Sequence, residues 1–494
     1  MTVSRSIAAF TMMLLFLGCR SGSNGVPEEQ FRMGNTPIGI QTVAAHLDVP
    51  WELVWGPDDQ IWFTEQRGTV SRLSPKTGEI TRLLTLERVL RDRTSGLLGM
   101  AIHPDFNKQP YVFLNYSGMR PDKSRFSRVV RYSYIPDTLV DSLVILEYPG
   151  WNGHFGARVS IAPDGKLIVA TGDGAQFENA QSLNSPNGKI LRFNVDGSIP
   201  DDNPIPGSPI WAWGLRNPQG LMHVGEKLYA SDHGDAVEDE VNLIRKGGNY
   251  GWPNVEGVVN TEKEQQFAAD SDIVQPLRSW TPTIAPAGMT YYSSDKLSEW
   301  KGRLLLTTLK GNSIYALALS GSGDSIVSDI VYFQQVFGRL RSICVSPDGD
   351  VYISTSNRDW NPNGFADEKD DRILRIYALD AKYADKNAKS AVIKVDGPDL
   401  VSAGEALYIN YCASCHKANG QGVDGTFPRL TRSSVVTGDP ESLIRMLLAG
   451  KNEMPRFSFL DDRDLAVLLT YIRKRFGSQA SPVRVSEVRA CRTH

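Results

Sequence analysis

The chain has 494 residues, more than one ordinary hydrophobic core organises, so we expect two domains with accessory segments. Its hydrophobic fraction of 41% and charged fraction of 22% are typical of a soluble globular protein. A formal net charge of −3, without any run of lysines and arginines, argues against a nucleic-acid partner.

The first residues have the composition of an export signal. Arg5 precedes an apolar run over residues 7–17 that is too short to cross a bilayer as a permanent helix. Residues 1–18 are therefore predicted to be a signal peptide, and the F-L-G-C sequence ending at Cys19 resembles a bacterial lipoprotein signal whose cysteine is lipidated. An ordinary secretory signal with an incidental cysteine is the alternative. We expect residues 19–37 to be a tether, and the protein to be periplasmic or in the cell envelope, anchored to a membrane by lipid.

One pattern recurs between residues 38 and 380: a tight turn followed by a short apolar or alternating strand. Residues 162–171 (A-P-D-G-K-L-I-V-A-T) and 346–355 (S-P-D-G-D-V-Y-I-S-T) show it clearly, and it occurs six times. Several copies are followed by a second strand. Six such units predict an all-β six-bladed propeller over residues 38–380. A β-sandwich is the alternative, but sandwiches do not repeat one hairpin signature six times.

The composition changes after Asp380 to Lys, Ala and Asp, which predicts a linker over residues 381–398. Apolar residues then recur three and four apart, as on helices, so residues 399–478 are predicted to be a small all-α domain. The segment 461–475 has an acidic start and a basic end, which is typical of an amphipathic helix. Residues 479–494 are expected to be a C-terminal tail.

The helical region contains the C-x-x-C-H pattern of covalent c-type haem attachment, at Cys412, Cys415 and His416. Two thiols on one helical turn reach the two vinyl groups of haem c, and the histidine binds the iron. A zinc or thioredoxin-like site is the alternative, but further zinc ligands and a βαβ pattern are missing. Met454, in N-E-M-P-R-F, is the expected sixth iron ligand, and Met446 in an apolar helix is its competitor. The region resembles class I cytochromes c, whose Met/His ligation raises the reduction potential and suits an electron acceptor.

The sequence has five cysteines, of which Cys19 is assigned to lipid and two to haem. Cys344, in an apolar stretch, and Cys491, near the C-terminus, remain. They are interpreted as a buried thiol and a free tail thiol, although a disulfide between them is an open alternative.

Four stretches of the propeller region resemble soluble quinoprotein glucose dehydrogenase and its aldose dehydrogenase relatives. They are G-L-L-G-M-A-I-H-P-D-F, G-S-I-P-D-D-N-P, G-L-R-N-P-Q-G-L and E-D-E-V-N-L-I-R-K-G-G-N-Y-G-W-P-N-V. The similarity runs in order through nearly all of residues 40–380. It implies an enzyme that oxidises the C1 hydroxyl of an aldose sugar to a lactone with pyrroloquinoline quinone (PQQ) and Ca²⁺. The fused haem implies that electrons pass from the reduced quinone to haem c and on to a respiratory acceptor, a cytochrome or an oxidase.

The resemblance also assigns residues to the quinone site. It places the catalytic histidine at His154, in N-G-H-F-G-A-R, where a neutral imidazole suits a general base. A structural loop histidine is the alternative. Arg216 is expected both to bind the quinone and to act in catalysis, and cations suit the three carboxylates of PQQ. The implied quinone-binding residues are Arg216, Asn217, Gln219, Thr283, Lys310, Arg339 and Arg341.

Calcium ligands follow from the same resemblance. The family binds the catalytic Ca²⁺ partly through two consecutive backbone carbonyls, which match Gly234 and Asp235, and this ion acts as a Lewis acid. The family commonly has proline at the second of these positions, so the aspartate is a departure. Glu240 and Tyr250 correspond to ligands of a second, structural Ca²⁺.

Two further departures limit what the resemblance implies about the substrate. The family has glutamine where this chain has Thr94, and aspartate where it has Gly153; both positions lie near the sugar. The preferred sugar therefore stays open, as does the electron acceptor. A non-catalytic binding propeller and a calcium-dependent lactonase are the alternatives, but both predict a degenerate quinone site, whereas the cations of this one are present.

Overall fold

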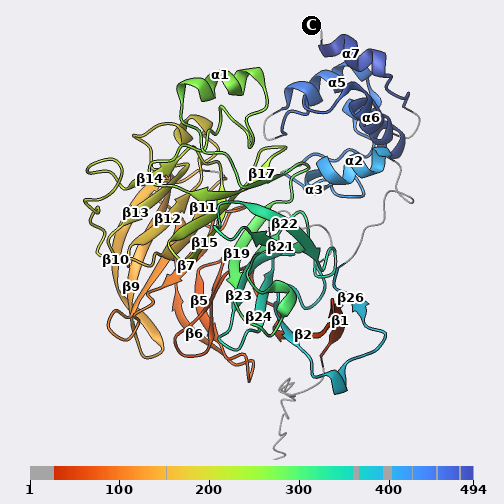
Figure 1. Ribbon diagram of the computed structural model, residues 1–494. Coiled ribbons are helices and arrows are strands. Elements are labelled where there is room, and N and C mark those ends of the chain that lie inside the picture. Colours follow the sequence, from red (N-terminus) through yellow and green to blue (C-terminus); the bar gives the residue numbers. More distant parts are fainter. Residues whose placement is uncertain are drawn as a thin grey trace, which may run out of the picture.

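The computed structural model describes residues 27–151, 153–359, 366–392, 403–425, 427–451, 454–477 and 480–492. These residues form a β-propeller followed by a helical domain (Figure 1), which confirms the predicted fold class. The predicted signal peptide and Cys19 lie outside the described residues. Among the described residues, no helix is long and apolar enough to cross a membrane.

Six sheets make up the propeller in the described part of the chain, five of four strands and one of six. The four-stranded blades consist of β3 (Pro50–Trp55), β4 (Ile61–Glu65), β5 (Thr69–Leu73) and β6 (Ile80–Thr85); β7 (Leu97–Ile102), β8 (Tyr111–Met119), β9 (Arg125–Ile135) and β10 (Thr138–Pro149); β11 (Gly156–Ile161), β12 (Leu167–Thr171), β13 (Lys189–Phe193) and β14 (Ile210–Trp213); β15 (Pro218–Val224), β16 (Lys227–Asp232), β17 (Asp239–Ile244) and β18 (Arg278–Trp280); and β19 (Pro286–Tyr292), β20 (Arg303–Thr308), β21 (Ser313–Leu319) and β22 (Ile326–Tyr332). The six-stranded blade consists of β23 (Leu340–Val345), β24 (Val351–Thr355), β25 (Ile373–Ala378), β2 (Thr36–Ala44), β1 (Glu29–Met33) and β26 (Lys389–Ser390).

The first strand of each blade is the innermost one. Strands β3, β7, β11, β15, β19 and β23 pack on one another in a closed ring around the axis. Each is antiparallel to the second strand of its blade. The turns recognised in the sequence join these two strands and therefore all lie at one end of the propeller. Residues that precede a first strand or follow a second strand meet at the opposite end.

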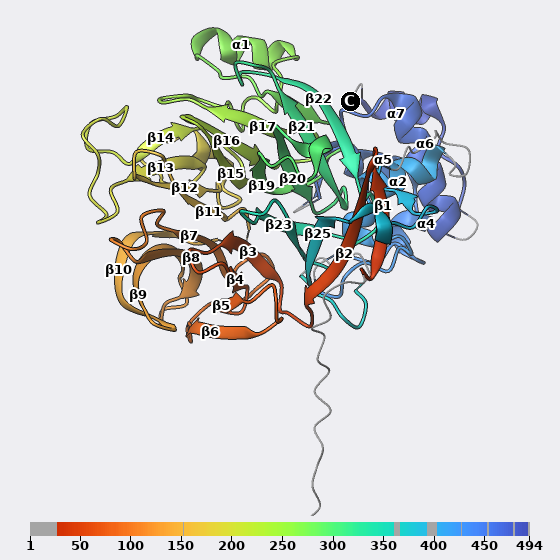
Figure 2. The same cartoon turned by 60° about the horizontal axis from the view of Figure 1, so that its bottom comes forward.

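The N-terminal strands close the ring. In the sixth blade β2 pairs with β25, so that Ile38 lies opposite Ala378 and Ile40 opposite Ile376. Figure 2 shows β1 and β2 beside β25. Both isoleucines are buried in a core that also contains Trp300. Because the start of the chain completes the last blade, the ring is held by strand pairing and apolar packing instead of a covalent link.

The first part of the expected linker runs along the sixth blade. β26 pairs parallel with β1, and Ala391 is fully buried. The N–H of Ala391 donates to the carbonyl of Arg32, and its own carbonyl accepts from the N–H of Phe333. The sequence shows no strand pattern here because two residues held by backbone hydrogen bonds have no periodicity. Residues 393–402 lie outside the described residues.

The helical domain follows. Its helices are α2 (Ala403–Tyr411), α3 (Ala413–His416), α4 (Ser434–Thr437), α5 (Pro440–Ala449), α6 (Asp462–Phe476) and α7 (Val485–Arg492); the propeller itself carries α1 (Glu262–Asp270) and the 3-10 helices η1 (Phe177–Ala180), η2 (Ser298–Trp300) and η3 (Ala381–Tyr383). Helices α2 and α6 cross closely at Gly404, where a Cβ would lie 2.6 Å from Cβ of Tyr471. The crossing therefore requires glycine at this position.

The predicted C-terminal tail contains helix α7, which packs on α5 and α6. Val488 and Cys491 on this helix are buried in the core of the helical domain. Among the described residues Cys344 and Cys491 are both buried and form no disulfide. The thiol near the C-terminus is thus a core group, because the last residues form an amphipathic helix rather than an extended tail.

Closure of the ring leads to a stability prediction. We expect Ile38→Ala to lower the free energy of unfolding of the propeller by about 2–5 kcal/mol, because it leaves a cavity in the closing blade. Urea unfolding followed by tryptophan fluorescence measures this, since all ten tryptophans lie between residues 51 and 360. Val327→Ala, at a side chain that is 64% exposed on β22, is the control and should change stability by about 0.5 kcal/mol or less. Equal effects of the two variants would show that packing of β2 in the sixth blade does not stabilise the propeller.

Candidate active site

The residues predicted to bind the quinone meet at one end of the propeller. His154 precedes β11, Arg216 and Asn217 precede β15, and Arg339 precedes β23, whereas Lys310 follows β20. Since first and second strands are antiparallel, all of these positions lie at the end opposite the repeated turns. Three further members complete the set: Gln219 in β15, Arg341 in β23 and Thr283 before β19.

His154 is held by a carboxylate that the sequence analysis did not identify. Strand β11 pairs with β12 so that Gly156 lies opposite Thr171, and His154 and Asp173 extend beyond this pair. Nδ1 of His154 lies 2.7 Å from Oδ1 of Asp173. A Cβ on Gly172 would lie 1.9 Å from the carbonyl oxygen of His154, so the close approach of the two segments requires glycine there. With Nδ1 bound to a carboxylate, Nε2 is the nitrogen that faces other partners.

Asp173 is fully buried and has a second fixed partner. Nε1 of Trp252 donates to its Oδ2 at 2.8 Å. Burial opposes ionisation of Asp173, but His154, Arg216 and Trp252 together lower its pKa below the ordinary value. The signal in the sequence was T-G-D-G, an aspartate directly after a buried strand. Asp173 thus gives His154 a carboxylate partner, although this chain has Gly153 where the family has an aspartate.

Arg216 and Asn217 are fixed through their backbone. The carboxylate of Asp232 accepts their N–H groups at 2.9 and 2.6 Å. Burial raises the pKa of Asp232, although these two hydrogen bonds oppose the shift. The guanidinium of Arg216 donates to the carboxylate of Asp235 at 2.8 Å and lies 5.2 Å from the ring centroid of Trp252. The side chain of Asp235, the departure noted in the sequence, is therefore engaged by Arg216.

Arg339 and Arg341 share one buried carboxylate, Asp359, at 2.6 and 3.4 Å. Arg341 also donates to Oε1 of Gln219 at 3.3 Å, which links two blades. Burial lowers the pKa of Arg341 to about 10, although Asp359 opposes the shift. Lys310 donates to Oγ1 of Thr283 at 2.6 Å. Asp359 carries no recognisable sequence signal because it lies in an irregular segment after β24.

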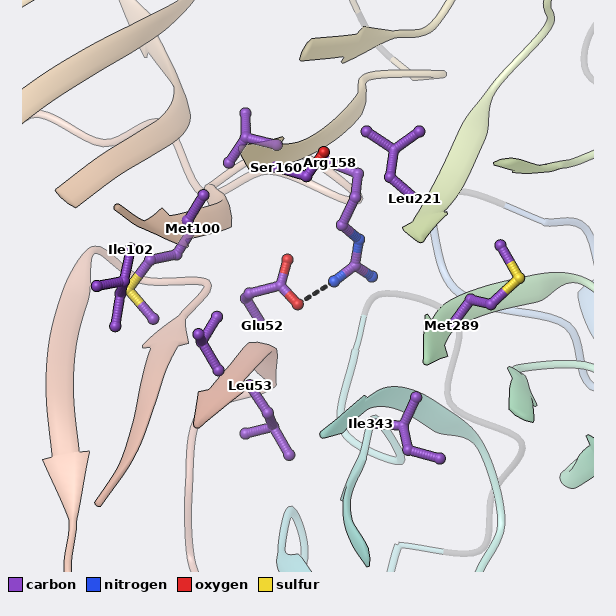
Figure 3. A pocket seen from close by; sticks show the side chains of 12 residues that line it. Glu52, Leu53, Met100, Ile102, Arg158, Ser160, Leu221, Met289 and Ile343 are labelled. Carbon is purple, nitrogen blue, oxygen red and sulfur yellow. Dashed lines mark hydrogen bonds and ion pairs between the residues drawn. The ribbon is translucent and has the colours of Figure 1, made fainter. Parts of the chain in front are cut away.

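A cavity of about 200 Å³ lies on the propeller axis and is lined by all six innermost strands (Figure 3). An ion pair between Glu52 and Arg158 crosses it, and the Arg158 guanidinium lies 4.5 Å from the ring centroid of Trp51. Nε of Arg158 donates to the carbonyl of Gln219 at 2.8 Å, which connects the ion pair to the quinone-binding set. Burial raises the pKa of Glu52, against the effect of Arg158. In the sequence, this buried charge is indicated only by the position of Glu52 within the apolar strand W-E-L-V-W.

The buried donors of this region fit an anionic ligand. Nε of Arg216, Nε of Arg341 and Nη2 of Arg158 have no hydrogen-bond partner within the described part of the chain. Buried donors without partners are costly, so a ligand with several carboxylates and carbonyls would satisfy them.

The residues expected to bind calcium lie beside this site. Gly234 and Asp235 follow β16 in a tight turn, where a Cβ on Gly234 would lie 1.8 Å from the carbonyl oxygen of Val237. Glu240 is buried in β17, and burial raises its pKa. The hydroxyl of Tyr250 donates to the carbonyl of Leu243 at 2.7 Å and accepts from the N–H of Arg245 at 2.9 Å, so its backbone carbonyl is the better candidate ligand. In the described ranges no three Asp, Glu, His or Cys side chains cluster as a metal site.

Three of the four predicted haem-binding residues lie at α3: Cys412 directly precedes this helix, and Cys415 and His416 are part of it. Nδ1 of His416 lies 2.8 Å from the carbonyl of Pro428, which leaves Nε2 for iron. Burial lowers the pKa of His416, in keeping with a neutral imidazole ligand. Cys412 is buried and Met454 packs against the same apolar core, whereas Met446 is half-buried on α5. A thiol, a free imidazole nitrogen and a thioether at one apolar core fit haem c.

The arrangement defines the class of protein: a propeller oxidoreductase with a fused cytochrome c domain. Residues 47–361 match the family model "Glucose / Sorbosone dehydrogenase", and residues 399–472 match "Cytochrome C oxidase, cbb3-type, subunit III". The chain belongs to the glucose/sorbosone dehydrogenase family, which confirms the predicted resemblance.

Two curated relatives and one solved structure illustrate the match. Quinoprotein glucose dehydrogenase B of Acinetobacter calcoaceticus is 30% identical over 406 residues, covering 64% of this chain and 84% of that protein. Aldose sugar dehydrogenase YliI of Escherichia coli (strain K12) is 30% identical over 338 residues, covering 64% and 90%. The PQQ-bound form of an aldose sugar dehydrogenase from Streptomyces coelicolor is 29% identical, with a TM-score of 0.60 and coverage of 69% and 98%.

The axial ion pair can be tested by removing one partner. We expect Glu52→Ala to lower the free energy of unfolding by about 3–5 kcal/mol, because Arg158 is left buried and uncompensated. The paired replacement Glu52→Leu with Arg158→Met should recover most of this loss, since it removes both charges. Urea unfolding followed by tryptophan fluorescence measures both, with Glu79→Ala on the exposed surface as the control. A Glu52→Ala protein as stable as this control would show that the pair does not form.

Proposed function

We propose that this chain is a PQQ- and Ca²⁺-dependent quinohaemoprotein that oxidises the C1 hydroxyl of an aldose to the lactone. Electrons pass from the reduced quinone to the fused haem c and on to a respiratory acceptor. The observation that carries the proposal is the convergence of the His154–Asp173 pair with buried cations from separate blades at one end of the axis. The PQQ-bound relative with the same fold supports the identity of the cofactor.

The quinone would be held by charge-assisted hydrogen bonds. Arg216 and Arg341 have unpartnered Nε donors within the described part of the chain, and Lys310 and Arg339 add positive charge. When bound, PQQ supplies the hydride acceptor for the sugar carbon. Asn217 would donate from its side-chain amide to the quinone, while its Oδ1 accepts from the N–H of Gly156 at 3.0 Å and orients the loop that carries His154.

His154 is assigned as the general base that removes the proton of the sugar hydroxyl at Nε2. Asp173 binds Nδ1, sets the tautomer and stabilises the imidazolium that forms. Arg216 is fixed between Asp235 and the ring of Trp252, so its guanidinium keeps one orientation beside the reacting groups. Its positive charge would stabilise the negative charge that the hydride brings from the sugar to the quinone site.

Calcium and haem complete the proposed set of cofactors. Backbone carbonyls of Gly234 and Asp235 would bind the Ca²⁺ that polarises the quinone, and Glu240 and Tyr250 would contribute to the second Ca²⁺. Cys412 and Cys415 would attach haem c, with His416 and Met454 as iron ligands. The orientation of His416 by Pro428 supports this assignment.

We also propose export and lipid anchoring through Cys19, which would place the enzyme in the cell envelope beside a membrane-bound respiratory chain. The apolar run and the F-L-G-C sequence support this. Membrane fractionation of cells producing the full chain and a Cys19→Ser variant tests it. A variant that remains in the membrane fraction would refute anchoring at Cys19.

The proposed activity is tested by absorbance after adding PQQ, Ca²⁺ and an aldose to the haem-loaded protein. We expect reduction of the haem, and His154→Ala should lower turnover by about a hundredfold or more while retaining quinone binding. Asp173→Asn should also lower turnover, and combining both changes should add little, because the two residues act as a unit. His46→Ala, at an exposed histidine, is the control. Turnover of His154→Ala equal to the control would remove this residue from the mechanism.

Quinone affinity tests the cation set. Arg341→Ala or Arg339→Ala should weaken binding of PQQ, because a carboxylate of the cofactor loses a charge-assisted partner. Fluorescence titration of the protein with PQQ measures this, and Arg278→Ala, at an exposed arginine on β18, controls for the loss of one positive charge. Unchanged affinity in both site variants would mean that the quinone binds elsewhere or not at all.

A further inference from the structure

The helical domain contacts the propeller at the end that carries the candidate active site. Nζ of Lys310 lies 5.9 Å from the ring centroid of Tyr411, the residue directly before Cys412. Figure 1 and Figure 2 both show the helices beside the propeller. The attachment turn of the haem motif therefore meets a residue that also belongs to the quinone-binding set.

A second residue of the helical domain lies near the same end of the propeller. Arg456, two residues after Met454, is near enough to Glu256 for its positive charge to act on that carboxyl, and Glu256 lines a cavity beside Arg216. Lys417, directly after His416, is repelled by Arg339 more than it is attracted by Asp359, so it does not favour the contact. Tyr411, beside Cys412, and Arg456, near Met454, are therefore the residues that favour it.

We propose that Tyr411 and Arg456 form the face through which the cytochrome domain docks on the mouth of the quinone site, and that this docked arrangement is the route of electron transfer. The inference deepens the proposed function and rests on it. Lys310 is the residue common to both sides: it donates to Thr283 within the propeller and lies against Tyr411 of the cytochrome domain. It acts as a positioning residue between the two cofactor sites.

The electron balance explains why a fixed contact is useful. Oxidation of the C1 hydroxyl to the lactone breaks one C–H and one O–H bond and releases two electrons and two protons. Ferric haem c takes up one electron on becoming ferrous. The haem must therefore be reduced twice per sugar and discharge twice to an external one-electron oxidant, such as a ferric cytochrome or ferricyanide. A donor and acceptor in one chain meet at an effective concentration that does not depend on protein concentration.

The chemistry of the contact fits docking that is specific but reversible. Arg456 and Glu256 carry opposite charges, and Lys310 lies beside the Tyr411 ring. Charge contacts of this kind fix orientation more than they add affinity, and they weaken with salt because the screening length is about 8 Å at physiological ionic strength.

Stopped-flow mixing of the PQQ-loaded full chain with an aldose tests the proposal by following quinone and haem separately. Haem reduction in the wild type should be independent of protein concentration. Arg456→Glu should slow it by about tenfold, with quinone reduction unchanged. Arg456→Lys should retain the wild-type rate, and Lys474→Glu, at an exposed lysine on α6, controls for charge reversal. Haem absorbance spectra confirm that each variant carries intact haem.

Hydrogen exchange of the ferric full chain, without sugar, provides a readout that does not depend on turnover. Amides around Lys310 and Arg339 should exchange faster in Arg456→Glu than in Lys474→Glu. Haem reduction proportional to protein concentration, or an Arg456→Glu variant identical to the control in both measurements, would overturn the docking face. If no aldose reduces the quinone, the proposed function fails, and hydrogen exchange alone then decides whether the face exists.

Discussion

Several positive charges are held close together at one end of the propeller axis, where they are largely shielded from water. Like charges in such surroundings repel strongly, so each must be compensated within a few ångströms. The structure does this with carboxylates from other segments: Glu52 for Arg158, and Asp359 for the two arginines of the sixth blade. The remaining unsatisfied donors make the region suited to an anionic cofactor. The rest of the site is arranged around this charge balance.

The balance depends on closure of the ring. Its charged residues come from different blades and keep their separation only if the sixth blade packs against the first. Strand β2 completes that blade by pairing with β25. Burial of Ile38 in β2 therefore helps to hold the blade together, including β23, which carries Arg341. Within each blade, the register of the first two strands then decides which side chains meet. His154 and Asp173 meet because Gly156 lies opposite Thr171.

The helical domain adds a second cofactor site to this frame. Its core is small and apolar, and the predicted haem ligands lie on segments that border it. The contact between Tyr411 and Lys310 links this core to the cation set of the propeller. The candidate quinone site and the candidate haem site therefore lie at the same end of the propeller, as the proposed electron transfer between them requires.

The sequence alone determined the elements and the chemistry that short segments encode. Six turn-and-strand repeats identified the propeller, C-x-x-C-H identified the haem motif, and the family-like stretches pointed to residues such as Arg216 and Arg341. Only the tertiary structure showed Asp173 as the partner of His154, Asp359 as the partner of the arginines, and the burial of Cys491. The physical reason is that periodicity and turn chemistry act between near neighbours, whereas these contacts form when distant strands and helices pack, and nothing in a local pattern records which distant residue will face which.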